Sequence, residues 1–350
     1  MIFISDYSAK YGGNFLASFS FLANKLAEKN VDVYFIFPQE AEKQHWEVDL
    51  SKYNVFYSEF SSQNLIATIK ACLRNNDHAI IHLNFLSSLF LIKMKKELKD
   101  YYVNFVFHQH MAINYSLKQT IKGLLLRKFA PKNTAYIGVS PEVYKDVKRE
   151  VGSKKSYLVL NAIDIKRLDT FSHFNNHNIL IFGTDFMRKG VDLSIKAIQH
   201  TKIEKECNLL IVTHKVEEAQ QLILDKFNKV PDFVQIIPPV QNVENLYHKS
   251  FLFLSPSRLE AFGYAVVEAA YSGNQVIVSD IPGQNVLANI PGIQMIQSEN
   301  INQLRAKITE AFTHRYDNRG KINQTARKYI TDHFSLEHWT NKILKIYNSF

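Results

Sequence analysis

The chain has 350 residues, of which 46% are hydrophobic and 21% are charged. This length and composition suit two domains that each bury a core, and they exclude a disordered or fibrous protein. The formal net charge is +9, and most of the excess lies early, because residues 1–160 hold 21 Lys and Arg against 14 Asp and Glu. A basic first half predicts an anionic partner unless the charge serves only solubility.

Short apolar runs alternate with helical patterns through the first half of the chain. The runs that predict strands are 1–5, 31–37, 54–57, 79–83, 103–107, 135–139 and 157–160, and the helical patterns include 16–26, 62–74, 86–99 and 141–150. This repeated order predicts a parallel sheet with helices on both faces.

The same alternation restarts after a polar, irregular stretch at 164–177. Strands are expected at 178–182, 208–213, 233–237, 251–254 and 275–279, with helices at 190–200, 215–228, 243–249 and 264–272. The chain therefore reads as two α/β units joined near residue 165. The tail, 335–350, has the pattern of an amphipathic helix.

Cysteine use and the chain ends favour a cytoplasmic protein. Cys72 and Cys207 lie far apart in apolar stretches, which makes a disulfide framework or a cysteine zinc site unexpected. The first residues lack the regions of a signal peptide, and the longest apolar run, 83–92, is too short and too polar to span a membrane.

The segment 255–283 contains two carboxylates, Glu260 and Glu268, with Phe262 and Gly263 between them. If a helix begins near Gly263, its free N–H groups and positive dipole end can bind a diphosphate. Glu260 would then lie in the preceding loop beside an attached sugar. Glu268, inside the helix, could accept two hydrogen bonds from ribose hydroxyls. The alternative is a helix with two solvated glutamates after an ordinary turn.

This segment resembles the signature of glycosyltransferase family 4, in which two glutamates accompany a Gly-Phe-Gly sequence. Here the sequence reads Glu260-Ala261-Phe262-Gly263, so alanine replaces the first glycine. The resemblance implies the α/β GT-B fold, with two Rossmann-like α/β/α domains facing an interdomain cleft. It implies an acceptor-binding domain at 1–164 and a nucleotide-sugar-binding domain at 165–334, and we expect the helix 335–350 to pack back on the first.

A second block begins at Gly183, which follows a predicted strand. A glycine here and Lys189 six residues later could together cradle a diphosphate leaving group. The family usually has arginine after this glycine, where this chain has Thr184. Arg188 could supply the missing charge or point to solvent, and an exposed helix-terminal lysine is the alternative for Lys189.

Two further candidates follow strands in the first half. A tight turn explains Gly13 on its own, but the resemblance implies that this glycine approaches the donor phosphate. His108 and His110 end the predicted strand 103–107, where ligands bind in open α/β sheets. The resemblance implies that His108 contacts the donor sugar. His110 could face the acceptor or be a surface histidine, and His82 and Asn84 are more simply structural than part of an acceptor site.

The resemblance implies a retaining transfer from a nucleotide sugar, which we expect to be a UDP-sugar. Lysine, glycine backbone and the helix dipole would stabilise the charge that grows on the diphosphate. Neither histidine of 108–110 has a carboxylate or third histidine at a helpful spacing, and we find no Asp-x-Asp sequence placed for a divalent ion. We therefore expect no metal ion or other cofactor to be required.

The basic segment 114–132 mixes lysine and arginine with leucine, isoleucine and phenylalanine. Basic amphipathic helices favour anionic membrane surfaces. We expect a glycan or lipid-linked acceptor, bacterial surface polysaccharide synthesis, and a peripheral contact with the inner face of the cell membrane. A core-packing helix with a solvated basic face is the alternative, and nothing resembles a nucleic-acid reading motif. A sugar-nucleotide epimerase and a non-catalytic partner subunit remain alternative functions.

Overall fold

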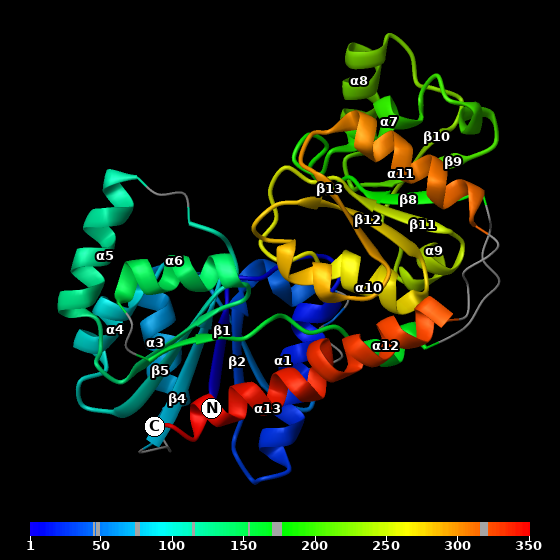
Figure 1. The fold of residues 1–350 in the computed structure, drawn as a ribbon. Helices are drawn as coiled ribbons and strands as arrows, with labels where there is room; N and C mark the ends of the chain where they lie inside the picture. Colours follow the sequence, from blue (N-terminus) through cyan, green and yellow to red (C-terminus); the bar gives the residue numbers. More distant parts are fainter. Residues whose placement is uncertain are drawn as a thin grey trace. The chain divides into compact units, whose positions relative to one another are not determined.

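The chain divides into two compact units, which Figure 1 shows as ribbons. The structure is a computed structural model, and it describes all residues except 45, 47–49, 74–77, 114–115, 153–154, 170–176 and 316–320. The first unit comprises Met1–Ala162 and Leu336–Phe350, and the second comprises Ile163–Ser335. These divisions lie close to the boundaries expected after residues 164 and 334. Half of the irregular stretch 164–177, residues 170–176, lies outside the described residues.

The first unit contains a seven-stranded sheet in the order β3-β2-β1-β4-β5-β6-β7. All of its neighbouring strands run parallel. The strands are β1 (Ile2–Ser5), β2 (Tyr34–Pro38), β3 (Asn54–Ser58), β4 (His78–Asn84), β5 (Tyr102–Gln109), β6 (Thr134–Gly138) and β7 (Ser156–Leu158). Near-continuous apolar strands of this kind form because helices cover both faces of a parallel sheet.

Alternate residues of β1 point into two different cores. Phe3 packs with residues of α1 and α13 on one face, whereas Ile2 and Ile4 pack with α3 and α4 on the other. Each fully buried side chain of this size contributes about 1.5–3 kcal/mol. The helices of this unit are α1 (Gly13–Ala27), α3 (Ser62–Cys72), α4 (Phe90–Glu97), α5 (Leu117–Phe129), α6 (Pro141–Val151) and α13 (Leu336–Tyr347).

The second unit contains a six-stranded parallel sheet in the order β10-β9-β8-β11-β12-β13. The strands are β8 (Asn178–Phe182), β9 (Asn208–Val212), β10 (Val234–Ile237), β11 (Leu252–Ser255), β12 (Gln275–Asp280) and β13 (Ile293–Gln297). The helices are α7 (Val191–Ile198), α8 (Val216–Phe227), α9 (Glu244–His248), α10 (Tyr264–Ser272), α11 (Ile301–Thr313) and α12 (Lys321–Phe334). One core joins the sheet to α7, α8 and α11, and α10 contacts α12.

The predicted class, α/β with parallel sheets, is confirmed in both units. The structure adds β13, α11 and α12, for which the sequence pattern made no prediction. The helix predicted at 86–99 is shorter in the structure, where α4 spans Phe90–Glu97. No helix in the described part of the chain is long and apolar enough to cross a bilayer.

Candidate functional site

The helix α10 begins at Tyr264 with Gly263 as its N-cap residue, close to the predicted start. Gly263 has a φ of +99°, a left-handed conformation that glycine adopts without strain. Among the described residues no side chain caps this helix end, so its first N–H groups remain available for an anion. The preceding Phe262 is buried and its ring lies 5.8 Å from that of Phe334. The Phe262 side chain therefore anchors the loop, and only its backbone can face a ligand.

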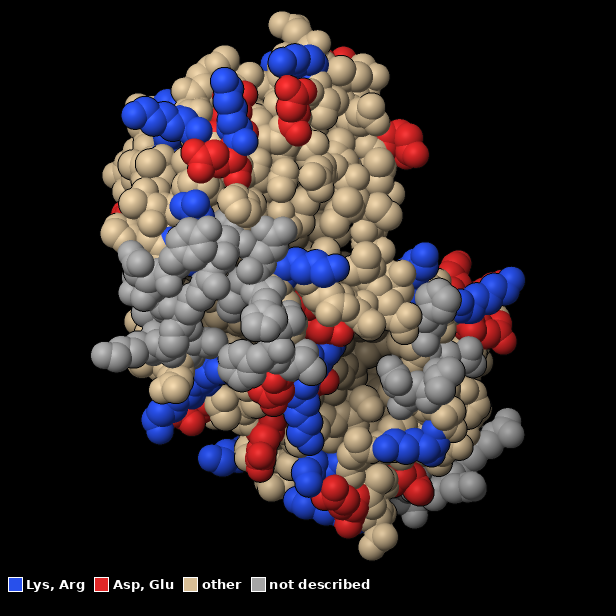
Figure 2. Space-filling model, turned by 90° about the vertical axis from the view of Figure 1, so that its right-hand side faces the viewer, with Lys and Arg blue, Asp and Glu red and all other residues tan. Residues whose placement is uncertain are grey.

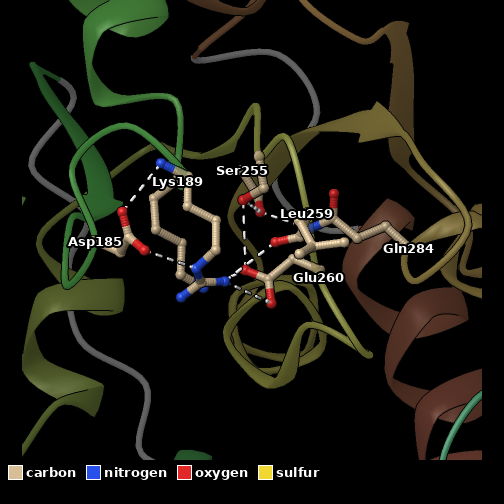
Figure 3. A network of polar contacts seen from close by, with 8 residues as sticks. Asp185, Lys189, Ser255, Leu259, Glu260 and Gln284 are labelled. Carbon is tan, nitrogen blue, oxygen red and sulfur yellow. Dashed lines mark hydrogen bonds and ion pairs between the residues drawn. The ribbon is translucent and has the colours of Figure 1, made fainter. Parts of the chain in front are cut away.

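Glu260 lies at the centre of a polar network, with Lys189 on one side and Ser255 and Gln284 on the other (Figure 3). The Lys189 ammonium donates to the Glu260 carboxylate. A guanidinium nitrogen of Arg188 lies 3.7 Å from the second Glu260 oxygen. Two cations therefore converge on one carboxylate, and Arg188 also pairs with Asp185 at 3.1 Å. An anionic ligand would have to compete with these carboxylates for the two cations.

A chain of buried polar groups supports Glu260 from the sheet side. The Gln284 amide donates to the Ser255 hydroxyl at 2.6 Å, and the Ser255 and Ser257 hydroxyls lie 3.3 Å apart. Ser257 then donates to Glu260 at 3.4 Å. The sequence pattern predicts no role for these side chains, because nothing in their spacing shows which carboxylate they reach.

The turn that carries Lys189 is attached directly to the loop after β11. Gly190 has a φ of +70°, and a β-carbon there would lie 2.1 Å from the Pro256 carbonyl oxygen. The Arg258 N–H donates to the Arg188 carbonyl at 2.8 Å. The Arg258 guanidinium binds both oxygens of Asp192, at 2.9 and 3.1 Å. These contacts hold the two loops as one unit, so Lys189 and Glu260 have a fixed spacing.

Glu268 lies inside α10 and is buried. One carboxylate oxygen pairs with Arg167 of the 3-10 helix η2 (Ile165–Leu168). The other oxygen accepts a 2.6 Å hydrogen bond from the Tyr247 hydroxyl. Burial, and then the Glu268 charge, raises the pKa of Tyr247, which keeps this hydroxyl a donor. The structure thus adds two partners, Arg167 and Tyr247, to the carboxylate that was expected to bind ribose.

Gly183 follows β8 and leaves no room for a side chain. A β-carbon there would lie 2.9 Å from Ile211 and 3.0 Å from Val191. The glycine lines a cavity of about 340 Å³ together with Thr184, Asp185 and residues of α8. Asp185 also accepts a 3.1 Å hydrogen bond from the Arg188 guanidinium. The cavity therefore borders the network around Glu260.

The remaining predicted residues, Gly13 and His108, belong to the first unit. Gly13 starts α1 with a φ of +53°, and a β-carbon there would meet nothing within 4 Å. His108 is buried at the end of β5. Its Nδ1 lies 3.2 Å from His82 Nε2, and its ring stacks on His110 at 4.3 Å. The His108 Nε2 has no partner among the described residues.

Burial lowers the pKa of each of these three histidines. The pKa of His110 falls to about 3, and those of His82 and His108 fall well below the ordinary value because of burial and then of the His110 charge. His108 and His110 line a cavity of about 320 Å³. The rings therefore offer this cavity neutral imidazole rather than positive charge.

In the part of the chain that the structure describes, no group of three or more His, Cys, Asp or Glu side chains could hold a metal ion. Whether activity is independent of metals stays a prediction. The groups that could bind a ligand around Glu260 are instead cations and backbone N–H groups, which suit a diphosphate.

Residues 169–329 match the family model described as glycosyl transferases group 1. This range is nearly all of the second unit, so the similarity to the group 1 glycosyltransferase model lies in that unit. Over 162 residues the chain is 28% identical to the O-antigen biosynthesis glycosyltransferase WclY of Escherichia coli. That alignment covers 46% of this chain and 44% of WclY, less than half the length of the relative.

Two solved structures share the fold over nearly the whole chain. A glycosyltransferase from Rickettsia africae has a TM-score of 0.81 at 18% identity, covering 99% of this chain and 98% of its own. Anabaena HepE (Alr3699), solved in complex with UDP, has a TM-score of 0.77 at 14% identity, covering 100% and 99%. The predicted GT-B fold is thereby confirmed.

Proposed function

We propose that the protein is a retaining glycosyltransferase that moves a sugar from a nucleotide sugar, most simply a UDP-sugar, to a glycan or lipid-linked saccharide. The observation that carries the proposal is the convergence of Lys189 and Arg188 on Glu260, in the unit that matches the group 1 glycosyltransferase model. HepE, which shares the fold, was solved with UDP. WclY acts in O-antigen biosynthesis, which supports a role in bacterial surface polysaccharide synthesis.

Donor binding would break the ion pair between Lys189 and Glu260, and each of the two side chains would then contact the donor. The diphosphate takes the Lys189 ammonium and the N–H groups at Gly263, because a doubly charged group competes well with a single carboxylate. Glu260, released from Lys189, then accepts hydrogen bonds from hydroxyls of the donor sugar and orients it. Glu268 binds the ribose, and its bonds to Arg167 and Tyr247 hold it in place.

In the transfer step the bond between the anomeric carbon and the diphosphate oxygen breaks, and a bond to the acceptor hydroxyl oxygen forms. The hydroxyl proton passes to the departing phosphate oxygen on the same face, which retains the configuration. Lys189 and Arg188 stabilise the charge on the leaving group.

The test is hydrolysis of a panel of nucleotide sugars (UDP-glucose, UDP-galactose, UDP-N-acetylglucosamine and GDP-mannose) by the purified chain. We expect release of UDP from a UDP-sugar, with the α-anomer of the free sugar appearing first in the NMR spectrum. Lys189→Ala should slow this release by about 100-fold or more. Release of the β-anomer would contradict retention, an epimerised nucleotide sugar would indicate an epimerase, and no turnover of any donor would favour a non-catalytic subunit.

A further inference from the structure

An apolar stripe runs along the solvent side of α5. We call it the α5 stripe, and it consists of Leu117, Ile121, Leu124, Leu125 and Phe129. Leu117 is 78% exposed, Leu124 is 59% exposed and Ile121 is 51% exposed. These positions recur at the spacing of one helix face. Exposed apolar patches of this kind mark interaction surfaces.

The stripe is exposed because α5 uses its other side for packing. Its buried residues are Gly123 and Leu126. A β-carbon at Gly123 would lie 3.0 Å from the Glu150 carbonyl oxygen, so the helix approaches α6 closely there. Lys122 pairs with the Glu150 carboxylate at 3.0 Å. The alternative interpretation, a core-packing helix, does not explain the α5 stripe, since the large side chains of the stripe contribute little to the core.

Positive charge surrounds the stripe. The sequence of α5 contains Lys118, Lys122, Arg127 and Lys128 and neither Asp nor Glu. The ammonium of Lys95, on α4, donates to the Phe129 carbonyl at 3.2 Å, which places this lysine at the end of the stripe. Charge is distributed differently on the face shown in Figure 2, where the described Lys and Arg side chains are interspersed with Asp and Glu.

We infer that α5 docks on an anionic lipid bilayer, with the α5 stripe inserted at the boundary between headgroups and acyl chains. A basic helix with an exposed apolar face has the chemistry of an interfacial membrane helix. Each lysine or arginine near an anionic surface contributes to the attraction, which salt weakens.

The docking also brings a cavity to the lipid surface. Gln119 and Lys122 of α5 line the same 320 Å³ cavity as His108 and His110. This part of the inference rests on the proposed function: a saccharide carried on a membrane lipid would enter the cavity from the headgroup layer. The acceptor class is then a lipid-linked saccharide rather than a free glycan.

The experiment is co-sedimentation of the full chain with vesicles at low salt. We expect binding to equal mixtures of phosphatidylglycerol and phosphatidylcholine at least tenfold tighter than to pure phosphatidylcholine. The double variant Ile121→Ser, Leu124→Ser should bind at least tenfold more weakly. Its control, Leu224→Ser with Val240→Ser, removes two half-exposed apolar side chains from the second unit and should bind like the wild type.

Two double charge-reversal variants separate the electrostatic contribution to binding from the apolar contribution. Lys118→Glu with Lys128→Glu should weaken binding to the anionic vesicles, and Lys202→Glu with Lys229→Glu, in the second unit, should not. Absence of binding at low salt, or unchanged binding of the stripe variant, would overturn the inference. So would a wild-type dimer that the stripe variant converts to a monomer. Hydrolysis of UDP-sugars without vesicles tests the proposed function separately, because the stripe lies outside the Glu260 network.

Discussion

Gly283 lies directly against the backbone of Glu260: a β-carbon at position 283 would stand 1.7 Å from the Glu260 carbonyl oxygen. No side chain fits in that space without moving the loop that carries the carboxylate. The close approach thus positions Glu260 relative to Lys189, and it gives the glycine a role that is separate from any contact with substrate.

We predict that Gly283→Ala lowers donor hydrolysis at least tenfold, because the Glu260 loop must shift. Overpacking of this kind also costs about 1–3 kcal/mol of stability. Gly152→Ala is the matched control, since Gly152 has a φ of +87° but nothing within 4 Å of its β-carbon position. The control should lose stability through backbone strain alone and keep its hydrolysis rate. Equal rates for both variants would show that the contact does not position Glu260.

Glu260→Ala should abolish transfer while the protein stays folded. The carboxylate is part of a partly buried polar network and not of either hydrophobic core, so we expect a loss of about 1–3 kcal/mol of unfolding free energy. The loss of the groups that orient the sugar should reduce the rate by a factor of about 100 or more. Thermal denaturation and hydrolysis, measured on the same sample, check both parts, and full activity would remove Glu260 from the site.

Glu268→Ala should weaken donor binding and destabilise the second unit together. The substitution leaves Arg167 and the buried Tyr247 hydroxyl without their shared acceptor, at a cost of about 1–3 kcal/mol. Glu268→Gln retains an oxygen that can accept from Tyr247, so it should recover much of the stability. Calorimetric titration with UDP should show at least tenfold weaker binding for the alanine variant. Unchanged affinity would mean that Glu268 is only structural.

The buried histidines should make the protein less stable as the pH falls below about 6.5. Their folded-state pKa values are lowered, that of His110 to about 3. The unfolded chain therefore binds protons that the folded chain excludes, and stability present above pH 6.5 is lost as the pH falls. Each such histidine contributes about 1.4 kcal/mol per pH unit in that window.

Unfolding free energies at pH 7.5 and 5.5 measure this effect. His110→Asn keeps a side chain that can donate to Asn84, which His110 contacts at 3.0 Å. This variant should show a smaller difference between the two pH values than the wild type, whatever its absolute stability. An equal difference would mean that His110 is protonated in the folded protein.

The sequence predicted the parts of the site that follow from local rules. Strand runs and the glycine before a helix placed Glu260 and Gly263 between β11 and α10, because a sheet strand followed by a left-handed residue and an amphipathic run has few other structures. The family resemblance added Lys189. Helix α5 was also predicted as basic and amphipathic, but the pattern could not tell which face packs.

The rest depends on contacts between distant segments. Gly283 reaches Glu260, Arg167 reaches Glu268, and Tyr347 reaches His82 at 2.6 Å only after the sheets have formed. The hydrophobic periodicity of a segment does not indicate which distant residues it will contact. Likewise, the sequence pattern did not predict the helices α11 and α12, although α11 packs on the core of the second unit.

Binding of UDP to the wild type and to Lys189→Ala tests the central claim most directly, since it requires neither the acceptor nor the sugar to be known. Lys307→Ala serves as the control, because Lys307 pairs with Glu310 on α11 and lies outside the lining of the second unit's cavity. We predict that UDP binds the wild type and the control, and binds Lys189→Ala at least tenfold more weakly. Equal affinity for all three proteins would contradict a diphosphate site at Lys189 and Glu260.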